Sequence, residues 1–355
     1  MLRRAGRLVI CTALIALLLG GIGLQNVAAH LGTHPLIATE LGVLRGHDGA
    51  VQGVAFSPTG LLIASAGADT SIRLWNSVTR EETATLFEHT SFAADVAFNP
   101  AYPEGEESEL LRLASASWDG TTIFWDVTPP GDATRTGTTD AFSGTVARIA
   151  YSPDGSLLAL AVGDGTARII DAATGELVRT LELDGGLQVN AVAFSPDGSL
   201  LATATGFPGT SAELWDVETG ELLNTLQGHT GSVTSLDFNP DGSLLATAGD
   251  DGFLVLWDVA TGEGLVGLDQ EVWVTDVAFA PHIDGSKELL ALALLDGRVY
   301  IWDVTDPLAA VEVGFLDGHK QRVNAVAFAP RTSDRRWMVA TASDDATIRL
   351  WEVVD

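Results

Sequence analysis

Cysteine is almost absent from this sequence: the only one among 355 residues is Cys11. Cys11 lies in an apolar stretch near the N-terminus, so the chain beyond that stretch has no thiol. Disulfide bonds, zinc–thiolate sites and cysteine nucleophiles are therefore excluded from that larger part of the protein. A chain without free thiols is compatible with an oxidising compartment.

Basic residues are also scarce. The chain carries 19 Lys and Arg residues against 47 Asp and Glu residues, which gives a formal net charge of −28 at pH 7. Such a surface repels phosphate groups, so we expect no nucleic-acid partner and no membrane contact beyond an N-terminal anchor. The charge is compatible with solubility, a cationic partner or a salty environment, and it does not choose among these.

Residues 1–29 have the pattern of a secretory signal peptide. Three arginines precede an uncharged apolar run at 8–24, and Val27-Ala28-Ala29 offers small residues for cleavage. We therefore expect an exported protein, periplasmic or extracellular, whose mature chain begins at His30 with a flexible segment at 30–35. An uncleaved signal anchor is the alternative, because the 17-residue run is at the lower limit for a membrane span.

Two short motifs alternate along the rest of the chain, and each occurs seven times. The first is an aromatic-x-Pro triplet, which begins at Phe56, Phe98, Tyr151, Phe194, Phe238, Phe279 and Phe328. The second resembles Trp-Asp, recurs every 42 to 50 residues, and begins at Trp75, Trp125, Ile170, Trp215, Trp257, Trp302 and Trp351. Self-similarity at such a period indicates a repeat architecture with one supersecondary unit per copy.

Each repeat is predicted to form four antiparallel strands. In the fifth repeat, the strands Val233–Phe238, Leu244–Ala248 and Leu254–Trp257 are separated by the turns Pro240-Asp241-Gly242 and Asp250-Asp251-Gly252. A further turn leads into a fourth strand. Four strands per repeat predict one propeller blade, so the fold class is all-β, a seven-bladed β-propeller.

The repeats resemble the WD-repeat family, the family of the G-protein β subunit, over about residues 41–355. The resemblance rests on runs such as Leu226-Gln227-Gly228-His229, Phe238-Asn239-Pro240-Asp241-Gly242 and Leu256-Trp257-Asp258. It implies a ring of blades around a central channel. It also implies a non-catalytic, protein-binding scaffold that needs no cofactor.

The ends of the repeat region predict how the ring closes. The seventh repeat reaches only its third strand, whereas residues 36–44 precede the first repeat and resemble outer strands such as Leu222–Leu226. An unpaired sheet edge is a liability. We therefore expect residues 36–44 to complete the last blade, so that a monomeric propeller spans residues 36–355.

Four repeats place a histidine, a hydroxyl residue, an aspartate and a tryptophan at matched positions. These sets are His47, Ser65, Asp69 and Trp75; His89, Ser115, Asp119 and Trp125; His229, Thr247, Asp251 and Trp257; and His319, Thr341, Asp345 and Trp351. Such a set could be a hydrolase triad or a buried hydrogen-bond network. An enzyme needs only one triad, and the resemblance implies a structural tetrad in each blade. We therefore predict no catalytic residues.

The third, fourth and sixth repeats lack the histidine. Leu160 and Leu292 occupy the hydroxyl position in the third and sixth, and Gly209 replaces the aspartate of the fourth. These blades should depend more on apolar packing and should open locally before the others.

The resemblance implies that partners dock on the face that carries the tetrad turns. The positions expected to project from that face are Gln52, Phe92, Trp118, Asp250, Trp273, Leu295, Arg322, Asn324 and Asp344. Exposed Trp, Phe and Arg residues are typical of binding hot spots. For Trp118 and Trp273, packing at the channel rim is the alternative interpretation.

Two other classes of function stay open beside the scaffold. One is a propeller enzyme, or a binder of a metal or redox cofactor, that uses the central channel. Such a site needs a cluster of channel-facing charged side chains, and none stands out in the sequence beyond the tetrads. The other is a detached sensor or regulatory module. The identity of the partner is not encoded in the fold.

Overall fold

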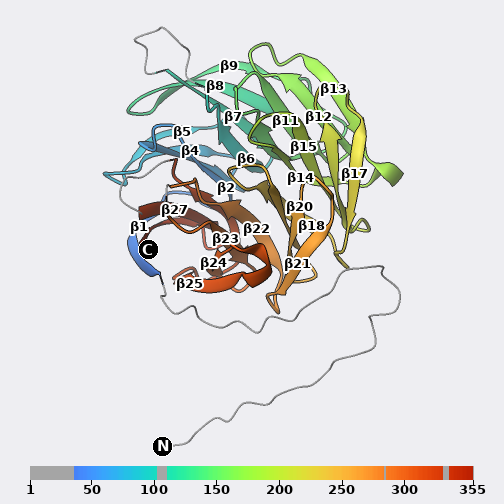
Figure 1. Ribbon diagram of the computed structural model, residues 1–355. Helices are drawn as coiled ribbons and strands as arrows, with labels where there is room; N and C mark the ends of the chain where they lie inside the picture. The colour runs from blue at the N-terminus through green and yellow to red at the C-terminus, as the bar shows by residue number, and fades with distance from the viewer. Residues whose placement is uncertain (1–35, 102–109, 284, 331–335, 355) are drawn as a thin grey trace, which may run out of the picture.

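A computed structural model describes residues 36–101, 110–283, 285–330 and 336–354. These residues form seven sheets, each of four antiparallel strands, which radiate as blades from a common centre (Figure 1). The predicted seven-bladed β-propeller is therefore confirmed. The expected signal segment at 1–29 and the segment at 30–35 lie outside the described residues.

The strands of each blade follow one another from the channel outward. Blade one contains β2 (Val51–Phe56), β3 (Leu62–Gly67), β4 (Ile72–Asn76) and β5 (Glu82–Leu86). Blade two contains β6 (Ala93–Phe98), β7 (Leu111–Ser117), β8 (Thr122–Thr128) and β9 (Asp132–Thr138). Blade three contains β10 (Val146–Tyr151), β11 (Leu157–Val162), β12 (Thr166–Asp171) and β13 (Leu177–Glu182). Blade four contains β14 (Val189–Phe194), β15 (Leu200–Thr205), β16 (Ser211–Asp216) and β17 (Leu222–Gln227).

The remaining blades repeat this order. Blade five contains β18 (Val233–Phe238), β19 (Leu244–Gly249), β20 (Phe253–Asp258) and β21 (Gly264–Asp269). Blade six contains β22 (Val274–Phe279), β23 (Leu289–Leu294), β24 (Arg298–Asp303) and β25 (Val311–Asp317). Blade seven contains β26 (Val323–Phe328), β27 (Arg336–Ser343), β28 (Thr347–Val354) and β1 (Ile37–Arg45). Two short 3₁₀ helices, η1 (Asp184–Gly186) and η2 (Pro307–Ala309), lie in connections.

The N-terminal strand closes the ring. β1 pairs antiparallel with β28, from Ile37 opposite Val354 to Arg45 opposite Thr347, with one irregularity between Glu40 and Gly42. In Figure 1 the blue N-terminal strand lies beside the last blade, next to the C-terminal end of the described chain. The predicted closure is confirmed, and it covers the edge that β28 would otherwise expose.

Turn residues set the hairpins where the sequence predicted them. Gly242 has a φ of +76° at the end of Pro240-Asp241-Gly242, a backbone conformation that glycine adopts at little cost. The Asp241 carboxylate accepts the N–H of Ser243 at 2.9 Å, which fixes the turn. The strand predicted at 233–238 has the bounds of β18, and the one predicted at 244–248 is one residue longer as β19.

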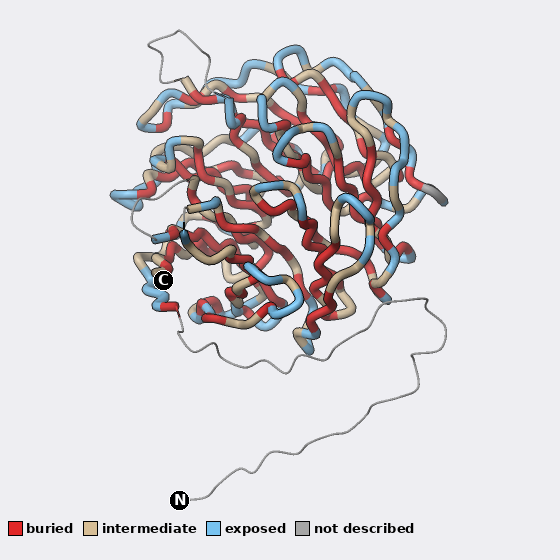
Figure 2. Tube along the Cα trace, viewed as in Figure 1, coloured by how far each residue is buried: buried red, intermediate tan, exposed pale blue. Residues whose placement is uncertain are grey.

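The hydrophobic core lies between neighbouring blades. One cluster joins Ala64 and Ala66 of blade one to Val96 and Phe98 of blade two, and similar clusters fill the other junctions. Every residue of β3 is buried, whereas no residue of the outer strand β5 is. In Figure 2, buried residues run along the strands and exposed residues lie mainly in the turns. Within the described ranges, no helix is long and apolar enough to cross a bilayer.

Candidate functional site

The predicted set in blade one forms a continuous hydrogen-bond chain. The Trp75 indole N–H donates to Ser65 Oγ at 2.9 Å, and Ser65 Oγ lies 2.8 Å from His47 Nε2. His47 Nδ1 lies 3.0 Å from Asp69 Oδ1. With the proton on Nδ1, each donor in this chain has an acceptor, as a buried polar network requires.

The other three sets repeat this geometry. The distance from the histidine Nε2 to the hydroxyl oxygen is 2.9 Å in blade two and 2.8 Å in blades five and seven. The tryptophan donates to the same oxygen at 2.9, 2.8 and 3.0 Å. The histidine Nδ1 lies 3.1 Å from the carboxylate in all three. The structure thus brings together His89, Ser115, Asp119 and Trp125; His229, Thr247, Asp251 and Trp257; and His319, Thr341, Asp345 and Trp351.

Burial prevents these four sets from acting as nucleophiles. Ser65, Ser115, Thr247 and Thr341 have no solvent-accessible surface. Each hydroxyl oxygen also accepts an indole N–H. A nucleophilic hydroxyl must be able to approach the reacting atom of a substrate. The arrangement is therefore that of a structural clamp within each blade.

The aspartates of these sets connect two turns. Asp251 Oδ2 accepts the N–H of Thr230, and Oδ1 accepts the N–H of Phe253. Burial alone would raise the pKa of Asp251, but the hydrogen bond from His229 and the backbone donors outweigh it and lower the pKa to about 2. For His319, burial lowers the pKa, although Asp345 opposes this. A neutral imidazole beside an ionised carboxylate agrees with the hydrogen-bond chain.

The three blades without histidine keep parts of the clamp. In blade four, the Trp215 indole N–H still donates to Thr203 at 3.0 Å. In blade three, Asp164 is bound instead by Arg168, at 2.6 Å. In blade six, the buried indole N–H of Trp302 has no acceptor among the described residues. Blade six therefore carries a buried polar group that the tetrads elsewhere satisfy.

The predicted docking positions gather around the mouth of the central channel. Gln52, Trp118, Asp250, Trp273, Arg322 and Asn324 line one cavity of about 370 Å³. Phe92, which is 41% exposed, lies against Trp118 with ring centroids 5.1 Å apart. Asp344 pairs with Arg322 at 3.2 Å, and the backbone N–H of Leu295 donates to Trp273.

One of these positions does not project as expected. Asn324 is buried, and its amide donates to the Val51 carbonyl at 2.9 Å and to Asp344 at 2.8 Å. It therefore joins blade seven to blade one, and its donors are already used. Trp118 and Trp273, by contrast, are each 51% exposed. Each of these two residues therefore leaves about half of its surface open to solvent.

A charged cluster in the channel was missed by the sequence analysis. Arg148 of β10 reaches Asp95 of β6 at 3.7 Å, Asp276 of β22 at 3.4 Å and the Asn324 carbonyl at 3.3 Å. Asp276 also accepts hydrogen bonds from Ser235 and from the backbone of blade seven. Arg148 thus connects blades two, three, six and seven across the channel.

A positional signal for this cluster exists in the sequence. Each member lies three residues before the aromatic residue of its triplet. In the seven repeats that position holds Gly53, Asp95, Arg148, Ala191, Ser235, Asp276 and Ala325. Burial raises the pKa of Asp95 to about 6, although Arg148 opposes the shift.

The opposite mouth of the channel is apolar. Its cavity, of about 630 Å³, is lined by the Phe and Pro residues of the triplets in blades one, two, five, six and seven, together with Asp237. Asp237 Oδ2 accepts the N–H of Phe279 at 2.8 Å, and burial raises the pKa of Asp237 to about 7.

Among the described residues, no three His, Cys, Asp or Glu side chains are grouped to hold a metal ion.

Comparison with known proteins agrees with this architecture. The family model "WD domain, G-beta repeat" matches residues 38–76, 80–126, 175–216, 220–258 and 310–352. The model "Anaphase-promoting complex subunit 4 WD40 domain" matches residues 111–187.

Individual relatives span most of the propeller. Guanine nucleotide-binding protein subunit beta of Oryza sativa subsp. indica is 26% identical over 304 residues, which cover 80% of this chain and 76% of that protein. The protein of the same name from Arabidopsis thaliana is 26% identical over 296 residues, with the same coverage. Nuclear distribution protein PAC1 of Arthroderma otae is 27% identical over 274 residues, 69% of this chain and 59% of that protein. The chain belongs to the WD domain, G-beta repeat family.

Proposed function

We propose that this chain is an exported, non-catalytic scaffold whose protein partner docks at the channel mouth on the face of the tetrad turns. The observation that carries this proposal is the exposure of Trp118 and Trp273, which rise from blades two and six beside one cavity. Tryptophan is enriched at binding hot spots, and half-exposed indoles offer large apolar area with a polar edge.

Two further observations support a protein partner. The plant relatives are named as a subunit of a guanine nucleotide-binding protein, so by name they work within an assembly of several chains. The net charge of −28 favours a partner with a cationic contact surface, because opposite charges speed and orient encounter.

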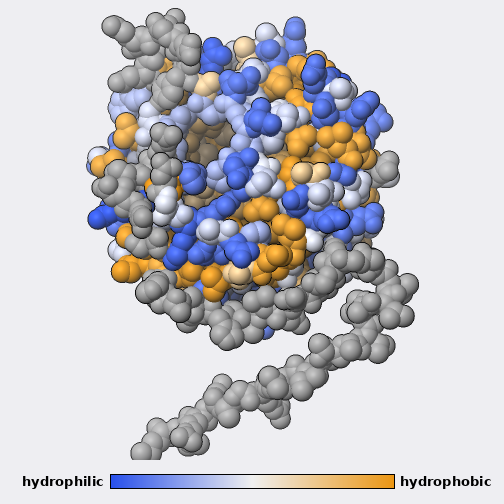
Figure 3. All heavy atoms as spheres, viewed as in Figure 1, coloured by the Kyte–Doolittle hydropathy of each residue, from blue (hydrophilic) through white to orange (hydrophobic). Residues whose placement is uncertain are grey.

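A second apolar surface serves as the comparison site. Leu177 and Val178 of β13 and Leu222 and Leu223 of β17 are between 42% and 57% exposed. Hydrophobic residues gather over these outer strands of blades three and four, on the right in Figure 3. This lateral patch lies away from the channel. It is the alternative surface on which a protein partner would dock.

Site-specific photo-crosslinking in the native host separates the two surfaces. A photoreactive phenylalanine analogue replaces Trp118 in one strain and Leu223, which is 49% exposed, in another. We expect a discrete crosslinked protein from position 118 and none from position 223. A crosslink from position 223 alone would overturn the proposed docking face.

Alanine substitution tests whether the two tryptophans are contacts or packing. The double variant W118A/W273A should weaken capture of the crosslinked partner at least tenfold, because each hot spot contributes about 2 kcal/mol or more. Its free energy of unfolding should change little, since both side chains are half-exposed. A large loss of stability with unchanged capture would show that they only support the rim.

Export is tested on the N-terminal segment. The protein from the exported fraction should begin at His30 when its N-terminus is sequenced. Recovery of the full-length chain in the membrane fraction would replace cleavage with anchoring.

A further inference from the structure

The seven repeats act as an internal alignment, and blade two departs from it at one position of its second strand. In every blade, one residue of the second strand pairs with the second residue of the Trp-Asp-like motif on the third strand. Six blades have an aliphatic residue or methionine there: Leu62, Leu157, Leu200, Leu244, Leu289 and Met338. Blade two has Arg112, opposite Asp126, and Arg112 is exposed.

Two aromatic departures occur at the same blade junction. Phe124 occupies a third-strand position that is Leu or Ile in the six other blades: Leu74, Ile169, Leu214, Leu256, Ile301 and Leu350. Tyr151 is the one tyrosine among seven triplets that otherwise begin with phenylalanine. Three separate departures from the repeat thus fall at the junction of blades two and three.

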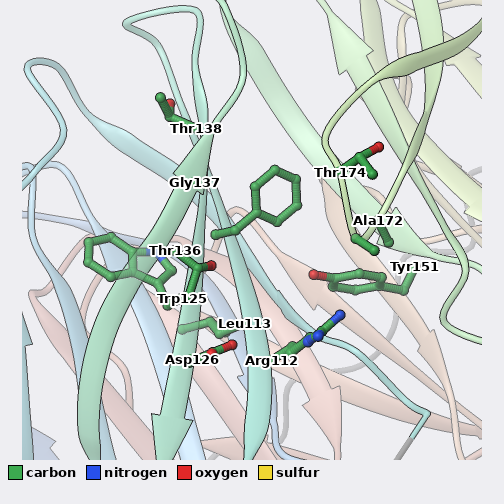
Figure 4. A pocket seen from close by; sticks show the side chains of 12 residues that line it. Arg112, Leu113, Trp125, Asp126, Thr136, Gly137, Thr138, Tyr151, Ala172 and Thr174 are labelled. Atoms are coloured by element: carbon green, nitrogen blue, oxygen red, sulfur yellow. The ribbon is translucent and has the colours of Figure 1, made fainter. Parts of the chain in front are cut away.

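All three residues line a single cavity of about 180 Å³. Figure 4 shows the Tyr151 and Thr136 hydroxyls turned toward each other across this space, with Arg112 below Tyr151. The Phe124 ring lies between two glycines, because a Cβ at Gly137 would lie 3.7 Å from it and a Cβ at Gly175 3.4 Å. The missing side chains leave room beside the ring.

The two charged side chains of this cavity are not paired with each other or with another charged group in the part of the chain that the structure describes. Among the described residues, no hydrogen bond or ion pair joins the side chain of Arg112 or Asp126 to another group. In blade three the equivalent Asp171 caps its hairpin by accepting the N–H groups of Ala173 and Thr174. In blade two the hairpin is longer, with β8 continuing to Thr128, so Asp126 lies within the strand and caps nothing.

The donors and acceptors around the cavity restrict its ligand. Arg112 only donates hydrogen bonds, Asp126 only accepts them, and the hydroxyls of Thr136 and Tyr151 do both. An anion would face Asp126 in a chain of net charge −28, and a cation would face Arg112. A neutral ligand with several hydroxyl groups satisfies both kinds of residue.

We propose that this cavity binds a single neutral sugar ring. The hydroxyls of a sugar pair with Arg112, Asp126 and Tyr151, and its apolar C–H face packs on the Phe124 ring. The cavity is smaller than the roughly 300–1,000 Å³ typical of drug-sized ligands, which fits one ring. It lies at the strand ends opposite the tetrad turns, so it is independent of the proposed docking face.

The test is ligand-detected NMR on the purified propeller with a panel of free hexoses and their methyl glycosides. Acetate, methylammonium and glycine are the charged and zwitterionic comparators. The variants R112L and Y151F restore residue types that the other blades carry, so both should fold. Y300F is the matched control, because Tyr300 lies on β24 and packs against Phe315 at 6.3 Å.

At least one neutral sugar should bind saturably. R112L should weaken its binding about tenfold or more and Y151F several-fold, because hydrogen bonds from charged groups are the stronger ones. Y300F should bind like the unaltered chain. Absence of saturable sugar binding, preference for a comparator, or unchanged binding in both variants would overturn the proposal. Crosslinking at position 118 should be unaffected by R112L, so this inference and the proposed function fail separately.

Discussion

At the scale of single residues, the hydroxyl group is the centre of each tetrad. Thr247 Oγ1 lies 2.8 Å from His229 Nε2 and accepts the Trp257 indole N–H at 2.8 Å. Removal of this hydroxyl leaves two buried polar groups without partners. The contribution of a tetrad to stability therefore depends most on its Ser or Thr, which is the least conspicuous of the four residues in the sequence.

The substitution Thr247→Val tests how much this hydroxyl contributes to the free energy of unfolding. Each unsatisfied buried group costs about 1–3 kcal/mol, so T247V should lose about 2–6 kcal/mol of unfolding free energy in urea denaturation. Thr203→Val in blade four is the matched control, because there only Trp215 loses its partner. T203V should lose about half as much. Equal losses in the two variants would mean that His229 gains nothing from Thr247.

Asp237 is a second residue whose position within the repeat sets it apart. The residue before the aromatic of each triplet is alanine in six repeats, at Ala55, Ala97, Ala150, Ala193, Ala278 and Ala327. In the fifth repeat it is Asp237, whose pKa burial raises to about 7. A carboxyl whose pKa is raised on folding favours the folded state at low pH. That stability is lost as the pH rises from about 4 through 7.

Asp237→Ala should therefore change how stability depends on pH. At pH 8 the variant should be more stable than the unaltered chain, by about 1–3 kcal/mol, because an ionised carboxylate no longer needs to be buried. At pH 4 the gain should vanish, and loss of the hydrogen bond to Phe279 should dominate. Urea denaturation at both pH values checks this. An identical difference at pH 4 and pH 8 would show that Asp237 does not titrate in this range.

At the scale of elements, β1 is the strand on which ring closure depends. Leu44 of β1 is 1% exposed and packs with Val51, Trp75 and Leu350. Ile37, at the other end of the same strand, is 68% exposed. Both residues lie on the paired strand, but only Leu44 is buried. Substituting each in turn therefore distinguishes the contribution of the buried side chain from that of the backbone pairing.

Leu44→Ala should lower the unfolding free energy by about 2–4 kcal/mol, through lost apolar burial and the cavity left behind. Ile37→Ala should stay within about 0.5 kcal/mol, because its side chain is largely solvated. Both are measured by thermal unfolding of the full chain. If L44A unfolded at the temperature of I37A, β1 would not hold the ring closed.

The elements were predictable and the facing of some side chains was not. Spacing and turn residues predicted strands such as β18 and the closing role of residues 36–44, because alternation and turn chemistry are local properties. The inner strands, however, contain a pairing irregularity after their first residue, as between Val146 and Arg148. Alternation counted through this point misplaces the next side chain, so the burial of Asn324 was not predicted. Arg148 is placed in the channel only when the position three residues before each triplet is compared across the repeats.

At the scale of the whole molecule, the repeat count predicted the fold because each copy specifies one blade. The tetrads were equally visible, since each lies almost entirely within one repeat. The docking positions, which come from several blades, were predicted only through the family resemblance, and two other sites shared between blades were not predicted. The cavity at Arg112 and Tyr151 and the cluster around Arg148 depend on which blades become neighbours after the ring closes. The few positions where one repeat differs from the rest therefore indicate such sites only when the neighbouring blades are known.

Arg148 has a consequence for how the two faces communicate. It spans the channel between Asp95 and Asp276, with a cavity at the mouth on either side. Arg148 itself lines the cavity on the face of the docking positions. A group that entered this cavity deeply enough to displace the guanidinium would break both ion pairs. The link between blades two, three and six would then be lost in one step.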